Sequence, residues 1–136
     1  MNITRRSFAG LSVAVATMAI APGQLLAGPA VRKGTLSGRR GYEVVGSVEL
    51  IKDGGTTKVV LKDDYVFDPS KNPPDIKIGF GNGEAYAEGS KIHDKLTVKS
   101  GAATFEVPAS IDTDQFSELY IYCEKFSVIL GVAALK

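Results

Sequence analysis

Apolar residues recur in short runs along most of the chain, and turn-forming residues separate the runs. The clearest alternation is in Asp75–Phe80, where three apolar residues share one face and Lys77 lies on the other. Side chains alternate between two faces in this way along a β-strand. Comparable runs predict further strands over 42–51, 57–61, 65–67, 95–98, 103–108, 118–123 and 126–135.

No segment has the 3.6-residue period of a helix, apart from one turn that Asp112 or Thr113 would cap. Many short strands at a spacing of about 8–12 residues are typical of a sandwich or barrel. The pattern therefore predicts an all-β fold, with one compact antiparallel β-sandwich or barrel-like domain over residues 31–136.

Turn residues add detail to this expectation. Gly46 interrupts the strand expected over 42–51, and a glycine inside a strand indicates a bulge or a close backbone approach. The residues Asp53–Gly55 predict a hairpin. Only Glu124 and Lys125 separate the last two expected strands, so a tight two-residue hairpin is expected there, followed by a strand buried on both sides.

The first 30 residues have the order of a secretory signal peptide: basic residues, an apolar run and then small residues. Arg5 and Arg6, one spacer and Phe8 resemble the twin-arginine export motif, without its usual later leucine and lysine. An uncleaved membrane anchor is the alternative, but Pro22–Gln24 interrupts the apolar run. We therefore expect a cleaved signal peptide over 1–30 and a mature form without a membrane span. The expected location is periplasmic or otherwise extracytoplasmic, reached by the twin-arginine route.

The composition excludes several functional classes. The chain has 16 basic and 15 acidic residues, a formal charge of +1 that becomes −1 without Arg5 and Arg6. A near-neutral domain has no electrostatic footprint for nucleic acid. One histidine and one cysteine provide neither a histidine cluster nor a thiolate metal site, and no P-loop, dinucleotide or GxSxG motif is present. We expect no metal site and no stand-alone enzyme activity.

Cys123 is the only cysteine of the chain. Strand parity places it on one face with Leu119 and Ile121, and places Tyr120 and Tyr122 on the other face. One interpretation is a buried, inert thiol, since free cysteine is among the most buried residue types. The other is a redox thiol or a ligand to a prosthetic group. A single thiol cannot form an internal disulfide, so redox chemistry would require a partner.

His93 is the only histidine and lies in the polar stretch SKIHDKL. One interpretation is a solvated loop residue, and the other is a ligand to a metal or haem. Cys123 and His93 are therefore the candidate cofactor-binding residues, with Cys123 also the candidate redox residue.

Four sequence blocks occur in an order that suggests one family. They are GTLSG with VVGSVEL, LKDDYVFD with NPPDIKIGF, KLTVKSGAATFEVPASID, and YIYCEKFSVILGVAAL. From about Gly34 to Leu135 the chain thereby resembles the DM13 domain, a small extracytoplasmic β module. The last block is the most specific, because it combines an aromatic residue, the cysteine, two residues, a phenylalanine and an apolar strand with a glycine.

The resemblance implies electron transfer at cell surfaces through a cysteine that acts as a bare thiol or holds a group such as haem. By position this cysteine is Cys123. The family often has tryptophan where this chain has Tyr122, and histidine where it has Tyr42. Haem is therefore disfavoured, and His93 would have to supply any imidazole.

Two functional hypotheses follow. The first is an exported electron-transfer accessory domain that acts through Cys123 on a redox protein partner. The alternative is a non-catalytic ligand- or protein-binding β-sandwich of the cell envelope, in which Cys123 only packs in the core.

Overall fold

The computed structural model describes residues 28–136, so nearly all of the expected signal peptide lies outside the described residues. The predicted all-β fold is confirmed, since strands and one short 3-10 turn make up the regular structure of this part. The strands are β1 (Ala30–Gly38), β2 (Val44–Asp53), β3 (Thr56–Leu61), β4 (Val66–Phe67), β5 (Ile76–Asn82), β6 (Ala85–Tyr86), β7 (Ala103–Val107), β8 (Glu118–Cys123) and β9 (Val128–Ala134).

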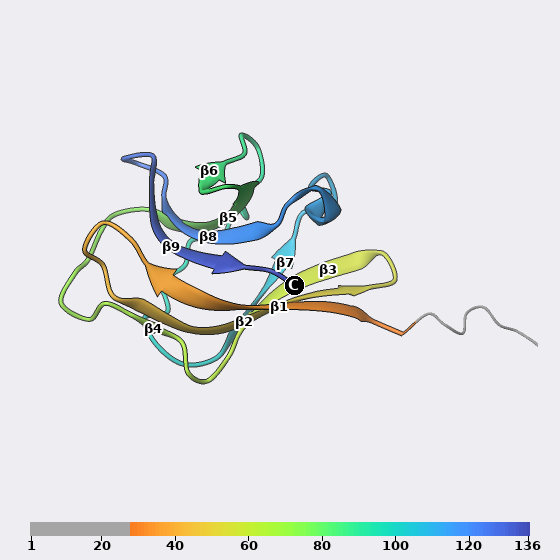
Figure 1. The fold of residues 1–136 in the computed structure, drawn as a ribbon, viewed down its shortest axis with the longest axis horizontal. Coiled ribbons are helices and arrows are strands. Elements are labelled where there is room, and N and C mark those ends of the chain that lie inside the picture. The colour runs from red at the N-terminus through yellow and green to blue at the C-terminus, as the bar shows by residue number, and fades with distance from the viewer. Residues whose placement is uncertain (1–27) are drawn as a thin grey trace, which may run out of the picture.

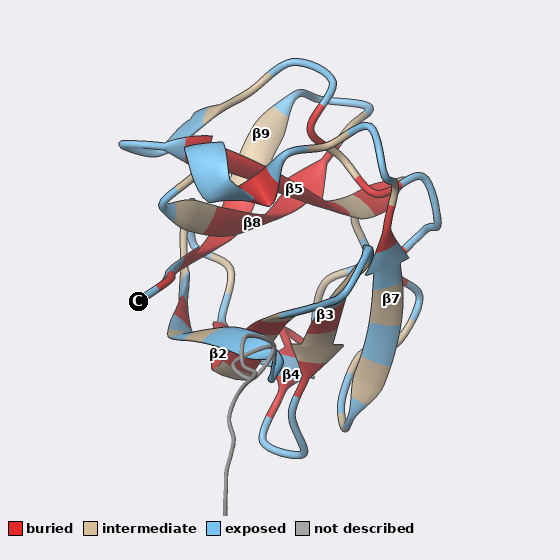
Figure 2. Cartoon of the chain, turned by 90° about the vertical axis from the view of Figure 1, so that its right-hand side faces the viewer, coloured by how far each residue is buried: buried red, intermediate tan, exposed pale blue. Residues whose placement is uncertain are grey.

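These strands form one antiparallel sheet in the order β6-β5-β8-β9-β1-β2-β3-β7, with β4 paired to β2 off this path. The sheet curls, so that β5 and β8 lie across the interior from β2, β3 and β4 (Figures 1 and 2). Figure 2 shows buried segments on both of these sides. The fold is therefore the barrel-like form of the prediction, an open half-barrel around one core.

Inward-facing side chains from both sides of the half-barrel fill this core. The larger side chains that are almost fully buried in it are Val44, Val48, Val59, Leu61, Tyr65, Ile78, Phe80, Ile92, Leu119, Ile121 and Leu130. A second, smaller apolar cluster lies on the outer face, where Tyr120, Tyr122 and Val132 pack with Tyr86 and Ile129. Alternation along β8 therefore supplies both clusters from one strand.

Strand β1 was not predicted, although it joins the two sides of the half-barrel by pairing with both β2 and β9. Its sequence AVRKGTLSG has few large apolar residues, and only Leu36 is buried. A side chain at Gly34 would lie 2.5 Å from the backbone oxygen of Ala134. The small residues that permit this close pairing are the same ones that weaken the strand signal.

The prediction of a strand over 95–98 is wrong. Residues 92–96 instead run beside β5 with isolated backbone hydrogen bonds, from the Ile92 amide to the Ile78 carbonyl oxygen (2.7 Å) and from the Leu96 amide to the Ile76 carbonyl oxygen (2.8 Å). Ile92 and Leu96 are buried, so their apolar character reflects core contacts and not a continuous ladder. Alternation over four residues cannot distinguish these two arrangements.

The hairpin between β8 and β9 is longer than predicted. Four residues, Glu124–Ser127, connect the strands, and the Ser127 amide donates to the Glu124 carbonyl oxygen (3.2 Å). Ser127 has a φ of 55°, in the left-handed region. Phe126, expected inside the buried strand over 126–135, lies instead in the turn and is 62% exposed. Because residues 126–135 are nearly all apolar, the sequence does not indicate that β9 begins only at Val128.

Two other local predictions are confirmed. The hairpin at Asp53–Gly55 joins β2 to β3. The helical turn is a 3-10 turn over Thr113–Gln115, and the Asp112 carboxylate caps it by accepting from the Asp114 amide (3.1 Å).

Gly46 marks a close backbone approach, as its position in the sequence predicts. Its φ is 123°, and a Cβ there would lie 2.4 Å from the Cα of Tyr65. At this point β2 passes from its partners β1 and β3 to the short partner β4. The residue therefore allows the chain to bend while the segment before β4 crosses over it.

Candidate functional site

Cys123 is the last residue of β8, where it pairs with Ile76 of β5 and Val128 of β9. Its side chain belongs to the same core cluster as Leu119 and Ile121, as strand parity predicts, and the residue is 1% exposed. The thiol is therefore at the end of a strand but inside the protein.

The segment before β5 closes over this thiol. The Cys123 sulfur donates a hydrogen bond to the Pro74 carbonyl oxygen (3.1 Å), and the next amide, of Glu124, donates to the Asp75 carbonyl oxygen (3.0 Å). We call residues 68–75 the covering loop. Two consecutive contacts thus attach it to the end of β8.

The base of the covering loop is held by Asp68. The Asp68 carboxylate accepts hydrogen bonds from the Ser70 hydroxyl (2.6 Å), the Ser70 amide (3.0 Å) and the Glu43 amide (3.1 Å). Lys99 donates to the Asn72 side-chain oxygen (3.1 Å), which attaches the middle of the loop to the segment that precedes β7. Side-chain hydrogen bonds therefore hold both the base and the middle of the loop.

Hydrogen bonds lower the pKa of Asp68 to about 2, first from the Ser70 hydroxyl, then from the Glu43 amide, with a smaller contribution from the Lys71 charge. A carboxyl whose pKa is depressed on folding stabilises the protein above its unfolded pKa of about 4. This stabilisation is lost as the pH falls through the folded pKa. Acid is therefore expected to loosen the covering loop.

Asp68→Asn is expected to lower the urea midpoint at neutral pH, because the amide accepts these hydrogen bonds more weakly than the carboxylate. The difference from the unsubstituted protein should shrink as the pH falls from about 4 towards about 2. Urea unfolding at a series of pH values measures it. Asp63→Asn is the matched control, since Asp63 is exposed in the preceding turn. A difference that is constant with pH would contradict this role of Asp68.

Charged side chains surround the same end of β8. Glu124 forms ion pairs with Lys77 and Lys91, and Asp75 lies 3.3 Å from the Lys77 ammonium and 3.9 Å from that of Lys95. These pairs link the covering loop, β5 and the hairpin turn. Three ammonium groups and two carboxylates therefore lie next to the loop that closes the thiol.

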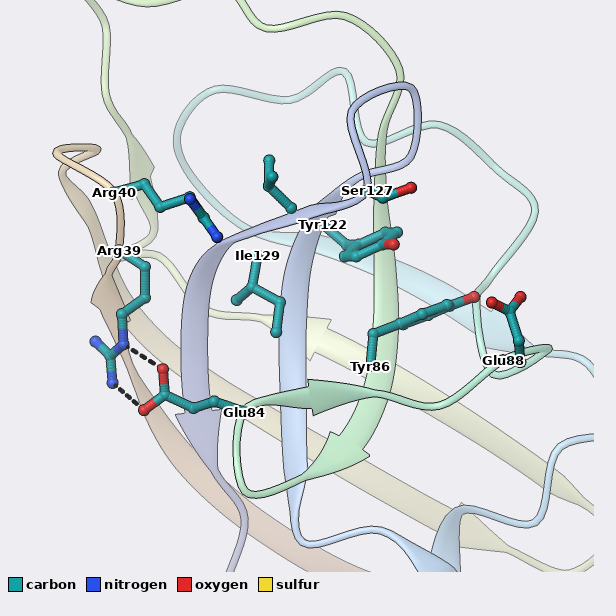
Figure 3. A pocket seen from close by; sticks show the side chains of 9 residues that line it. Arg39, Arg40, Glu84, Tyr86, Glu88, Tyr122, Ser127 and Ile129 are labelled. Carbon is teal, nitrogen blue, oxygen red and sulfur yellow. Dashed lines mark hydrogen bonds and ion pairs between the residues drawn. The ribbon is translucent and has the colours of Figure 1, made fainter.

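On the outer face, Tyr122 stacks on Tyr86, with 4.2 Å between the ring centroids and 15° between the planes. A Cβ at Gly79 would lie 2.8 Å from the Tyr86 ring, so the absence of a side chain there makes room for it. Burial, and then the nearby Glu88 carboxylate, raise the pKa of Tyr86. Figure 3 shows the pair beside a hollow that Arg39 and Arg40 border on another side.

A family model described as "Electron transfer DM13" matches residues 37–135, which is most of the chain. The chain belongs to the DM13 family. The resemblance seen in the sequence blocks is thereby confirmed, and the family's description supports a general role in electron transfer, with a redox partner. No curated protein and no solved structure matches the chain. Over residues 28–136, no helix is long and apolar enough to cross a membrane.

The other candidate residue of this DM13 domain lies elsewhere. His93 is exposed in the loop after β6 and borders a hollow with Thr56 and Glu106, at the β3 and β7 edge. Tyr42 is half-buried against Phe67, with ring centroids 5.9 Å apart. The structure does not bring His93 to Cys123.

The residues around Cys123 do not fit a haem in this conformation. The sulfur is enclosed by the core and the Pro74 carbonyl group, which leaves no open face for a planar ring system. Within residues 28–136, no three His, Cys, Asp or Glu side chains are grouped as metal ligands. We therefore derive no step through a haem.

Two parts of the site were missed in the sequence. The Pro74 carbonyl is 49 residues from Cys123 and is a backbone group, so no residue type signals its contact. The stacking of Tyr86 on Tyr122 depends on the short pairing of β6 with β5. Gly79 was the available signal for it, because a glycine in an otherwise apolar strand indicates a close neighbour.

Proposed function

We propose that this DM13 domain is an exported electron-transfer accessory module that exchanges electrons with a redox protein partner through Cys123. One observation carries the proposal: the only thiol of the chain is buried at a strand end and donates its hydrogen bond to a backbone carbonyl of the covering loop. A thiol needed only for packing could occupy any core position. At this position, movement of one loop would expose the sulfur while the β8 ladder stays intact.

The chemical step is thiol–disulfide exchange with a disulfide of the partner. The Cys123 thiolate attacks one partner sulfur, the partner's S–S bond breaks, and a mixed disulfide forms. The second partner sulfur leaves as a thiolate and takes up the proton that Cys123 lost. One disulfide and one thiol are thus replaced by one disulfide and one thiol, and the partner sulfur that leaves is reduced.

Opening of the covering loop gates this step. In the closed form the thiol is buried and donates to Pro74, so neither a partner nor an oxidant can reach it. Local opening of loops requires less free energy than global unfolding. A partner that contacts the charged side chains of Asp75 and Glu124 would meet the loop at its attachment to β8.

Export to an oxidising compartment would explain why the Cys123 thiol is buried. We propose cleavage of residues 1–30 and delivery by the twin-arginine route to the periplasm or another extracytoplasmic space, on the basis of Arg5 and Arg6 and the apolar run that follows. An exposed single thiol in an oxidising compartment would exchange with any available disulfide compound and form mixed disulfides. A closed covering loop restricts reaction to partners that open it.

The second candidate function is a binding module in which Cys123 is only packing. The near-complete burial of Cys123 and its place in the main core cluster favour this alternative. The two candidates differ in the chemical state of the sulfur in the cell.

That state can be measured on protein isolated from its export compartment after rapid acid quenching and alkylation of free thiols. The proposal expects a fraction of Cys123 in a reductant-sensitive adduct with a second protein. A free thiol in every molecule, under both oxidising and reducing growth conditions, would favour the packing alternative. An absorbance spectrum of the same sample checks for haem independently of the thiol count.

A further inference from the structure

The outer face of the sheet carries a hollow that the proposed electron-transfer step does not use. It has a volume of about 550 Å³, within the usual range of small-molecule sites, and is open to solvent. Arg40, Tyr86, Tyr122, Ile129 and Glu88 border it. Cys123 faces the opposite side of the sheet, so this hollow is separate from the thiol.

Its aromatic wall is closely packed. The Tyr86 and Tyr122 rings are stacked nearly parallel, and Tyr122 is only 7% exposed. Gly79 lets the Tyr86 ring lie directly on β5, since any Cβ there would collide with it. Figure 3 shows the rings edge-on beside the hollow. Ring edges carry partial positive charge, so they favour the face of another aromatic ring.

Two arginines border the hollow, and they differ in their contacts. Arg39 is fully engaged: it forms a bidentate pair with Glu84 (2.7 and 3.1 Å) and also donates to Ser37 and Gly38. Arg40 is exposed and its side chain makes no hydrogen bond or ion pair with any residue over 28–136. Figure 3 shows its guanidinium directed over Ile129. Arg40 is therefore the cation available to a ligand.

A carboxylate lies at the other side of the hollow. Glu88 is exposed, and its charge raises the pKa of the Tyr86 hydroxyl after the larger effect of burial. Figure 3 shows Glu88 near that hydroxyl, across the hollow from Arg40. One side therefore attracts an anion, the other attracts a hydrogen-bond donor, and the aromatic and aliphatic wall lies between them.

We infer that this hollow binds a small planar aromatic acid whose ring carries a hydroxyl or amino group opposite the acid group. The acid group pairs with Arg40, the ring packs on Ile129 and the edges of the tyrosine pair, and the opposite group donates to Glu88. An acid group matters because guanidinium recognises carboxylate and phosphate in a planar, bidentate way. This inference concerns binding alone and does not depend on the proposed redox role of Cys123.

The test is a titration of the folded domain with 4-hydroxybenzoate, followed by amide chemical shifts and calorimetry. We expect saturable binding with a Kd on the order of 0.1–1 mM, as suits a ligand of this size. Three comparison ligands each lack one feature: phenol lacks the acid, benzoate lacks the donor and 4-hydroxycyclohexanecarboxylate lacks the planar ring. Each of these three ligands should bind several-fold more weakly than 4-hydroxybenzoate.

Variants assign the contacts. Arg40→Gln should weaken 4-hydroxybenzoate about tenfold and leave phenol unchanged. Glu88→Gln should weaken 4-hydroxybenzoate more than benzoate. Lys58→Gln, which removes an exposed cation on β3, is the charge-matched control and should change nothing. Both pocket substitutions are at exposed positions, so the fold should be retained.

Shift changes confined to residues around Tyr86, Tyr122 and Ile129 would support the site. The inference would be overturned by an absence of saturable binding, by shift changes elsewhere, or by an equal loss of affinity in Arg40→Gln and Lys58→Gln. Equal affinity for all four ligands would also overturn it, because the proposed features would then not select a ligand.

Discussion

Cys123→Ala is expected to abolish electron exchange between the domain and its partner while leaving the domain folded. Alanine removes the sulfur that we propose attacks the partner's disulfide, and no second cysteine can replace it. Loss of a buried side chain of this size should lower the free energy of unfolding by about 1–3 kcal/mol. The readout is the amount of reductant-sensitive adduct in exporting cells and the redox state of the protein trapped in it.

Ile121→Val is the matched control for this prediction. It lies on the same strand and face as Cys123, is fully buried and should cost about 0.5–1.5 kcal/mol while keeping the thiol. Electron exchange should therefore survive in Ile121→Val. If Cys123→Ala retained exchange with the partner, or if both variants lost it equally, the role of the thiol would be refuted.

Gly46→Ala is expected to lower the free energy of unfolding by about 3 kcal/mol or more, although it adds a single methyl group. The new Cβ would lie 2.4 Å from the Cα of Tyr65 and 2.8 Å from the backbone oxygen of Asp64. These are backbone atoms, so they cannot relieve the clash by a rotamer change as a flexible side chain could. The φ of 123° adds strain, because residues with a Cβ rarely adopt it.

Gly55→Ala provides the comparison, since a Cβ there would meet no atom within 4 Å. Its free energy of unfolding should stay within about 0.5 kcal/mol of that of the unsubstituted domain. Thermal or urea unfolding of the two variants measures the difference. Equal stability of Gly46→Ala and Gly55→Ala would show that β2 does not need the close approach to the segment before β4.

Much of the fold follows from strand periodicity. Alternation identifies β5 and β8, and the parity of β8 places Cys123 inward and Tyr122 outward. Gly46 signals the close approach because only glycine tolerates it. These features are local, so the sequence contains the information needed to predict them.

Other features depend on distant contacts. The apolar neighbours of Phe126 predict a buried strand, but the turn geometry at Ser127 places it in solvent. Strand β1 was missed because it has few large apolar residues, and its close approach to Ala134 of β9 depends on Gly34. The contact between Cys123 and the Pro74 carbonyl oxygen was missed, because every residue type has a backbone carbonyl and none signals this contact. Such contacts are set by the curled sheet as a whole.

The central claim is that the covering loop can expose Cys123 without unfolding the half-barrel. The most direct measurement is the rate at which folded protein reacts with a small aromatic disulfide, followed over low urea concentrations and compared with global unfolding. We expect the thiol to react through local opening, whose free energy is smaller and depends less on urea than that of global unfolding. The reaction rate should also be higher in Asp68→Asn than in Asp63→Asn. Reaction only through global unfolding, with the same free energy and urea dependence, would contradict the account.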